Sequence, residues 1–159
     1  MARDIHNIND NFYLILGLDF RKPETDNKLI QNRIEQKKLE WSGKSNNVSK
    51  ANQVKRYLDF VNDKSMTKVM LPDVDDEQEQ ENRLNEAKAA ISIVDNKVKE
   101  TLNAVVSAYK IKKSVLDNMV LKFPEYYLTY AMLEQMLTKL NVTIVDDTKK
   151  TQNKKNSER

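Results

Sequence analysis

The sequence contains no cysteine, one histidine, two glycines and three prolines among its 159 residues. Without cysteine there is no disulfide scaffold, no thiol nucleophile and no cysteine-based zinc site. The single histidine, His6, leaves no histidine cluster for a metal ion or a proton relay. Two glycines are too few for glycine-rich phosphate loops and for the turns that strands and hairpins need. These absences exclude most all-β folds, disfavour an enzyme and predict no bound cofactor.

Long hydrophobic runs are absent as well. No apolar stretch approaches the ~20 residues that a membrane span requires, and residues 1–10 lack the apolar centre of a signal peptide. We therefore expect no membrane association and a cytoplasmic location. The net charge is only +3, from 27 basic and 24 acidic side chains, so the charge balance does not by itself indicate nucleic acid. The frequent Asn and Lys favour a bacterial origin.

What the sequence does contain is helical periodicity. Apolar spacings and boundary residues predict helices over residues 11–18, 26–41, 49–61, 65–70, 76–109, 112–123 and 124–140, and a loop over 42–47. Gly17 and Asn141 are expected to end helices in the left-handed conformation, and Pro124 to begin one. Residues 142–145 predict one short strand with no evident partner. The fold class is therefore predicted to be all-α.

The clearest periodic signal lies in the long helix expected over residues 76–109. Apolar residues recur there at spacings of three and four, which is typical of a heptad pattern. The predicted seam consists of Leu84, Ile91, Val94, Val98, Leu102 and Val105. Such a stripe must be covered, either by later helices of the same chain or by a second copy. The short link at residues 110–112, and the lack of an Asn or Lys that sets register, favour an intramolecular hairpin and a monomer over a coiled-coil dimer.

The expected elements divide the chain into four segments. Residues 8–71 form a small bundle, 76–109 the long helix and 110–145 a C-terminal helical unit. Residues 147–159 form a basic tail without apolar side chains, which cannot bury enough surface to become ordered. A linker there would make the chain the N-terminal part of a larger protein.

Three stretches of the first segment share the spacing of a known family. The opening helix, residues 11–18, has the sequence NFYLILGL, and the third helix ends in Val61-Asn62-Asp63. Further apolar matches in the second and third helices are Ile30, Ile34, Leu39, Val54 and Leu58. Residues 11–63 thereby resemble a J-domain, the co-chaperone module of DnaJ-like proteins, whose first helix has the pattern D-Y-Y-x-I-L-G-V and whose third ends in V-L-S-D.

This sequence lacks the residues of the family's functional loop. J-domains stimulate ATP hydrolysis by a heat-shock chaperone through a His-Pro-Asp loop, and Ser42, Gly43 and Lys44 occupy those positions. The chain lacks the imidazole, the rigid proline and the carboxylate there. The resemblance therefore implies a J-like scaffold without ATPase-stimulating activity, since a fold does not carry its function with it.

The docking helix of the family is altered too. Glu35 and Gln36 stand where J-domains carry basic residues, and Lys37 and Lys38 stand where they usually carry Leu and Ala. Reversed charge removes electrostatic steering toward the chaperone. Trp41 falls on the aromatic position before the loop; it is a candidate binding residue, although its place on the apolar face favours the edge of the core. Glu35, Gln36 and Trp41 form the candidate interaction surface.

These features predict interaction rather than chemistry. The acidic run over residues 73–81 lacks the spacing and central glycine of an EF-hand, so we interpret it as a helix start favoured by the helix dipole. One hypothesis is an adaptor that binds an unidentified protein through the J-like surface and the long helix. The alternative is a nucleic-acid binder that uses the C-terminal helix pair and the basic tail. The start of helix 124–140 is poor in Lys and Arg, which favours the adaptor.

Overall fold

The computed structural model describes residues 3–44 and 49–147. Within them the chain forms seven α-helices, one 3₁₀ turn and two three-residue strands, which confirms the all-α class. None of the described helices is long and apolar enough to cross a membrane. The predicted basic tail, 147–159, lies outside the described residues except for Asp147.

The chain divides into two compact units, the first ending at Ile93 and the second beginning at Val94. The boundary falls inside one continuous helix, α5 (Glu77–Val105), so the long helix is not the separate segment that the sequence predicts. Each unit contains part of α5.

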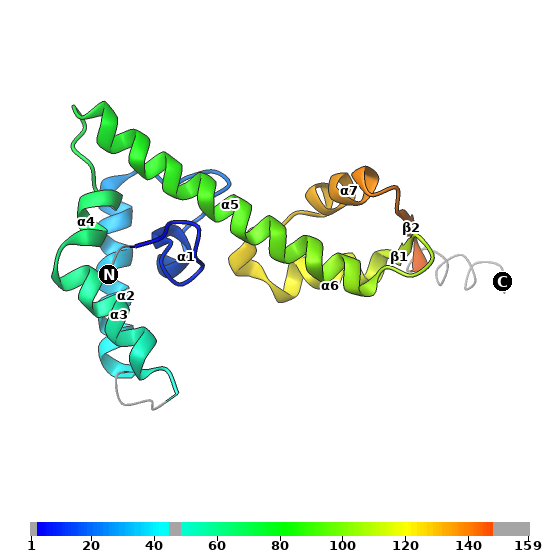
Figure 1. The fold of residues 1–159 in the computed structure, drawn as a ribbon, viewed down its shortest axis with the longest axis horizontal. Coiled ribbons are helices and arrows are strands. Elements are labelled where there is room, and N and C mark those ends of the chain that lie inside the picture. Colours follow the sequence, from blue (N-terminus) through cyan, green and yellow to red (C-terminus); the bar gives the residue numbers. More distant parts are fainter. Residues whose placement is uncertain (1–2, 45–48, 148–159) are drawn as a thin grey trace, which may run out of the picture. The chain divides into compact units, whose positions relative to one another are not determined.

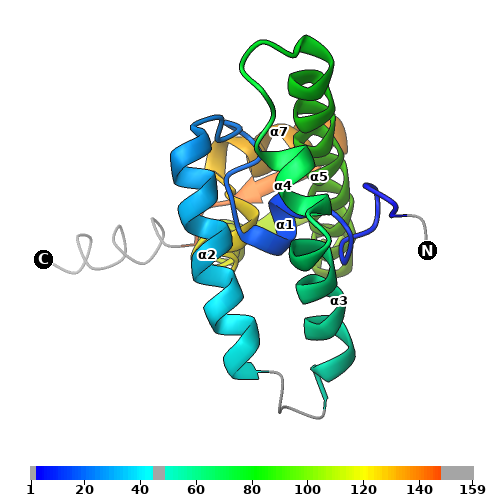
Figure 2. The ribbon, with the colours of Figure 1, turned by 90° about the vertical axis from the view of Figure 1, so that its left-hand side faces the viewer.

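The first unit is a helical bundle built on an antiparallel pair. Helices α2 (Asn27–Lys44) and α3 (Ala51–Asn62) lie side by side and run in opposite directions (Figures 1 and 2). The short α1 (Phe12–Leu16) packs against α2, and α4 (Ser65–Met70) covers the far end of the pair. The largest fully buried side chains of this unit are Phe12, Tyr13, Leu16, Phe20, Ile30, Ile34, Met66 and Met70.

Local hydrogen bonds explain where these helices begin and end. Asn11 caps α1, because its side chain accepts the Leu14 amide at 3.2 Å. Gly17 ends α1 with φ 68°, which confirms the predicted left-handed cap. At the start of α2 the carboxylate of Asp26 accepts a hydrogen bond from the Lys28 amide at 2.9 Å.

The loop predicted over residues 42–47 is wrong in its first half. Ser42, Gly43 and Lys44 belong to the last turn of α2, and residues 45–47 lie outside the described residues. A Cβ at Gly43 would meet no atom within 4 Å, so the backbone there has an ordinary helical conformation and open surroundings. The glycine was a loop signal in the sequence, but a single exposed glycine is tolerated in a helix at a small cost.

The second unit contains a β-α-α-β arrangement after the last part of α5. Strands β1 (Lys110–Lys112) and β2 (Thr143–Val145) pair in parallel, with Ile111 opposite Ile144. Parallel strands need a long crossover, and α6 (Lys113–Lys122) and α7 (Tyr130–Lys139) supply it. The strand predicted over residues 142–145 thus has a partner. That partner is β1, whose residues the sequence analysis expected to be a link between helices.

The helix predicted over residues 124–140 is broken. Pro124 begins only a 3₁₀ turn, η1 (Pro124–Tyr126), because Tyr127 adopts φ 50° and ends it. A new helix, α7, then starts after Thr129, whose side chain accepts the Met132 amide at 3.3 Å. Asn141 has φ 58°, which confirms the left-handed end predicted there.

The predicted heptad seam of α5 is only partly correct. Val94, Val98 and Leu102 are buried within the single chain and Ile91 is half-buried, but Leu84 and Val105 are 43% and 45% exposed. The buried stripe instead follows Ala87, Ala90, Val94, Val98 and Leu102. A straight α-helix drifts by about 20° per heptad, so residues seven apart leave the stripe toward its ends. The pattern belongs to an ordinary packed helix rather than to a coiled-coil seam.

This difference predicts unequal effects at two positions that a heptad would treat alike. Val98→Asp places an unpaired carboxylate in the core of the second unit and should lower its stability by several kcal/mol. Val105→Asp, on the half-exposed last residue of α5, should cost about 1 kcal/mol or less. Urea denaturation followed by circular dichroism measures both. Equal losses of stability in the two variants would instead support the predicted heptad seam.

Candidate interaction surfaces

The exposed face of α2 is the candidate surface that the sequence predicted, but the residues on it differ in part from those predicted. Glu35 and Gln36 are both exposed on it. Two leucines are exposed as well, Leu29 and Leu39, and the side chain of Leu39 is 77% exposed. The sequence analysis grouped Leu39 with Ile30 and Ile34 as apolar positions of this helix, but Leu39 lies on the exposed side.

Five of the exposed residues of α2 form one stripe. Positions 29, 32, 36, 39 and 43 follow each other at steps of three and four, so they share one side of the helix. The stripe consists of Leu29, Asn32, Gln36, Leu39 and Gly43. We call it the α2 stripe. The buried residues of the helix, Ile30, Ile34 and Trp41, lie on its opposite side.

Ion pairs flank the α2 stripe without covering it. Glu35 pairs with Lys38 at 3.3 Å and also accepts a hydrogen bond from Gln31 at 2.9 Å. Lys37 pairs with Glu40 at 3.1 Å, and this hydrogen bond is the main reason that the pKa of Glu40 lies below its usual value. Exposed pairs of this kind contribute little to stability. They hold charged side chains beside Leu39 and leave its apolar surface open.

Trp41 does not belong to the interaction surface. Its side chain is 5% exposed, and its ring lies 5.3 Å from that of Tyr57 on α3. The ring therefore fastens α2 to α3. Ser42, Gly43 and Lys44, the positions of the family's functional loop, are exposed on the last turn of α2.

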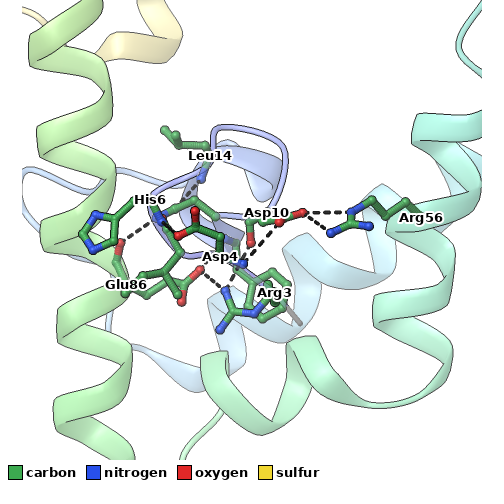
Figure 3. A network of polar contacts seen from close by, with 10 residues as sticks. Arg3, Asp4, His6, Asp10, Leu14, Arg56 and Glu86 are labelled. Atoms are coloured by element: carbon green, nitrogen blue, oxygen red, sulfur yellow. Dashed lines mark hydrogen bonds and ion pairs between the residues drawn. The ribbon is translucent and has the colours of Figure 1, made fainter. Parts of the chain in front are cut away.

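A buried polar network, drawn in Figure 3, anchors the N-terminal segment to α5. The carboxylate of Glu86 is almost fully buried, and it accepts hydrogen bonds from the Phe12 amide at 2.7 Å and from the Arg3 guanidinium. The guanidinium also lies over the Phe12 ring, 3.9 Å from its centroid. Asn11 donates to the backbone carbonyl of Glu86 at 2.8 Å. These contacts fix the start of α1 on the side of α5.

A second carboxylate extends the network to α3. Asp10 Oδ1 accepts a hydrogen bond from Arg56 Nε at 2.8 Å and forms an ion pair with Nη2 at 2.6 Å. Asp10 also accepts the Asp4 amide at 3.2 Å. His6 is exposed, and its backbone amide donates to Asp4 at 2.9 Å. Among the described residues no buried side-chain polar atom lacks a hydrogen-bond partner, so the network is structural rather than a site awaiting a ligand.

A third buried charge joins α5 to the ends of α2 and α4. The guanidinium of Arg83 donates to Asn27 Oδ1 at 2.8 Å and to the Met70 carbonyl at 3.1 Å. Arg83 and Tyr13 line a cavity of about 570 Å³. Burial raises the pKa of Tyr13 to about 12; the charge of Arg83 opposes this shift, and those of Glu86 and Glu24 add to it.

The sequence did not single out Arg3, Glu86 or Arg83 as functional residues. A signal was present: Arg83 and Glu86 precede Ala87 and Ala90 at spacings of three and four, which places two charges on the apolar side of α5. A charge on such a side must be paired when the helix is buried. Nothing in the sequence indicates that Arg3 is the partner of Glu86.

The C-terminal helix pair offers few basic residues at the positions that read nucleic acid. The only base in α7 is Lys139, near its C-terminal end. Lys113 lies over the Tyr130 ring at 5.6 Å and pairs with Asp117 at 3.7 Å, and Lys122 lies over Phe123 at 5.7 Å. These lysines are therefore engaged within the unit. The basic tail that the nucleic-acid hypothesis also needs lies outside the described residues.

The described residues contain no group of three or more His, Asp or Glu side chains placed to hold a metal ion. The acidic run over 73–81 forms the turn before α5 and its first helical residues, as the sequence predicts. No family model, no curated protein and no solved structure matches this chain.

The buried phenol of Tyr13 predicts a pH dependence. Its folded pKa, about 12, lies above the ordinary value of 10.0, so the folded state holds this proton more tightly than the unfolded state. The resulting stability is fully present below pH 10 and is lost as pH rises toward 12, by roughly 3 kcal/mol at most. Tyr13→Phe should therefore lose less stability than the wild type over that range.

The comparison needs a reference at each pH, because lysines and other tyrosines titrate in the same range. Tyr13→Phe also loses the hydrogen bond to the Glu24 carbonyl, about 1 kcal/mol at every pH. The control is Tyr109→Phe, at an exposed tyrosine, which should follow the wild type. If the unfolding free energies of all three proteins changed with pH by the same amounts, the raised pKa of Tyr13 would be refuted.

Proposed function

We propose that this chain is a non-catalytic protein–protein interaction module, built on a scaffold that resembles a J-domain but lacks ATPase-stimulating activity. The observation that carries the proposal is the α2 stripe. It presents Leu39 and Leu29 to solvent on the helix that corresponds to the docking helix of the resemblance. An adaptor needs such a surface, and a helix face with anchors at steps of three and four is a common form of it.

The scaffold supports this surface by holding α2 rigidly. Trp41 on the buried side packs against Tyr57, and Ile30 and Ile34 are fully buried. A rigid helix loses little conformational freedom when a partner binds, which favours affinity. The apolar anchor at Leu39 stands between charged neighbours, as in interfaces whose polar rim surrounds an apolar centre.

The region that would act on a heat-shock chaperone has a different chemistry and a different conformation. Ser42, Gly43 and Lys44 lack the imidazole and the carboxylate of the family's loop, and they are helical. Glu35 adds negative charge to the face that carries basic residues in J-domains. We therefore expect the partner to be a protein other than the family's chaperone, and the purified protein to leave the chaperone's ATPase rate unchanged.

The alternative is a nucleic-acid binder that uses the C-terminal helix pair and the basic tail. This alternative predicts that the affinity for nucleic acid falls steeply as the salt concentration rises, with a slope that follows the number of phosphates neutralised. The scarcity of bases in α7 disfavours it. Retention on DNA at low salt that survives the substitutions below would favour it over the adaptor.

The test of the proposal is a matched pair of surface substitutions. Leu39→Lys removes the apolar anchor of the α2 stripe, and Leu121→Lys makes the same change at a leucine of α6 that is equally exposed, 79% against 77%. Both variants should fold like the wild type, since neither side chain is buried. Proteins captured from the native host by the wild type are identified, and each purified candidate is titrated against the three chains.

The proposal expects one partner whose affinity falls by about tenfold or more with Leu39→Lys and stays unchanged with Leu121→Lys. Equal affinities for all three chains would show that the α2 stripe is not the binding surface. Stimulation of a heat-shock chaperone's ATPase by the wild type would contradict the proposal directly.

A further inference from the structure

The second unit contains a cavity of about 470 Å³ with an apolar wall and basic residues beside it. Four aliphatic side chains from α5, β1, α6 and β2 line it: Val105, Ile111, Val115 and Val145. Ser107, Lys110 and Lys112 complete the lining, and all three are exposed. Such a cavity suits an aliphatic side chain that carries acidic neighbours.

The backbone beside this cavity is strained. Ser107 and Lys110 exchange two hydrogen bonds of 3.0 Å, and the two residues between them adopt left-handed φ angles, 53° at Ala108 and 60° at Tyr109. This tight turn normally contains Asn and Gly. It presents Tyr109, which is 72% exposed, next to the half-exposed Val105. Strained backbone and an exposed aromatic together are typical of a binding surface.

The two lysines that line the cavity, Lys110 and Lys112, are exposed. Lys113 is engaged with Asp117, and Asp147 is engaged with Ser114 through hydrogen bonds of 3.0 and 2.5 Å. Neither Lys110 nor Lys112 forms an ion pair with a described residue. Asp146 and Asp147 directly follow β2. Hydrogen bonds from Ser114, with a smaller contribution from the charge of Lys112, hold the pKa of Asp147 below its usual value. Lys112 therefore already interacts with one carboxylate of its own unit, and both lysines stay exposed to a further one.

The chain itself contains a segment with the complementary chemistry. In the turn before α5, Val74 is 79% exposed and stands between Asp73 and Asp75. Among the large apolar side chains exposed in the described residues, only Val74 has a carboxylate on both sides. We call residues 73–76 the acidic turn.

The acidic turn is held in one conformation by its own hydrogen bonds. The Asp76 amide donates to the Asp73 carbonyl at 3.1 Å, and the Asp75 amide donates to the Asp73 side chain at 3.1 Å. Gln80 donates to the carbonyl of Val74 at 2.5 Å. An ordered turn that already presents its apolar side chain loses little freedom on docking.

We propose that the cavity of one chain binds the acidic turn of a second copy, with Val74 in the cavity and its aspartates beside Lys110 and Lys112. We assign the occupant to a second copy on charge complementarity, because the two aspartates beside the exposed Val74 match the two lysines beside the aliphatic wall of the cavity. Binding within one chain is a separate outcome of the test below. This contact uses neither the α2 stripe nor its partner, so it goes beyond the proposed function and stands or falls separately.

The absence of cysteine from the sequence makes the contact directly testable. Val74→Cys and Ser107→Cys are prepared as separate proteins, mixed and oxidised mildly. We expect a mixed disulfide between the two variants. The matched control pairs Val74→Cys with Leu121→Cys, which places the second thiol at a side chain as exposed as Val74 but away from the cavity.

A mixed disulfide with Ser107→Cys at least about tenfold faster than with Leu121→Cys supports the contact. Equal rates would overturn it. The double variant with both cysteines in one chain, oxidised at high dilution, tests the occupant: an internal disulfide there would show that the chain binds its own turn and would overturn the assignment to a second copy.

Light scattering tests the same contact without cysteines. The average mass should rise with concentration and fall with added salt, since the contact joins opposite charges. Lys110→Glu with Lys112→Glu should weaken association about tenfold or more, whereas Lys97→Glu with Lys99→Glu, on exposed positions of α5, should not. A wild type that stays monomeric at every concentration in low salt would refute the proposal.

Discussion

The first unit depends on one buried carboxylate. Glu86 lies within α5 at 1% exposure, and a charge placed there must be paired and hydrogen-bonded or it destabilises the fold. Its partners come from residues 3–12: the Arg3 guanidinium, the Phe12 amide and, through the carbonyl of Glu86, the Asn11 amide group. Because α1 is only five residues long, it cannot persist by itself in water. The Glu86 contacts therefore decide where α1 lies, and α1 in turn supplies Phe12, Tyr13 and Leu16 to the core.

One helix serves two cores with different side chains. In the first unit the buried side of α5 carries Ala87 and Ala90, which allow close approach, together with the paired charges of Arg83 and Glu86. In the second unit it carries Val94, Val98 and Leu102, which fill space by their own volume. The first core therefore requires specific hydrogen-bond partners for its charged side chains. The second core requires apolar side chains of suitable volume, and it tolerates more substitutions.

Prediction from the sequence succeeded where local chemistry decides. Helix α4 was predicted with its observed bounds, and the left-handed ends at Gly17 and Asn141 follow from the conformational preferences of those residue types. The broken helix after Pro124 was missed because it depends on Tyr127, a residue type with no turn signal. Strand β1 was missed because three residues between helices show no period of their own, and its partner lies 33 residues away.

The candidate surface was likewise predicted only in part. Glu35 and Gln36 are exposed as predicted, but Trp41 is buried and Leu39 is not. Periodicity identifies an apolar side of a helix only when apolar residues are absent from the other side. In α2 both sides carry them, and packing against α3 decides which side is covered. The polar network could not be predicted for a related reason, since its two ion pairs join residues that are 46 and 83 positions apart.

The most direct test of this account is amide hydrogen exchange in Glu86→Ala, compared with the wild type and with Glu81→Ala, a change at an exposed acid five residues earlier in α5. Removing the carboxylate leaves the Phe12 amide and the Arg3 guanidinium without their partner, a loss of about 3 kcal/mol. The account predicts that the amides of α1, beginning with Phe12, lose protection in Glu86→Ala, that α2 and α3 keep theirs, and that Glu81→Ala exchanges like the wild type. Unchanged protection of α1 in Glu86→Ala would contradict the claim that the buried carboxylate holds the N-terminal segment in place.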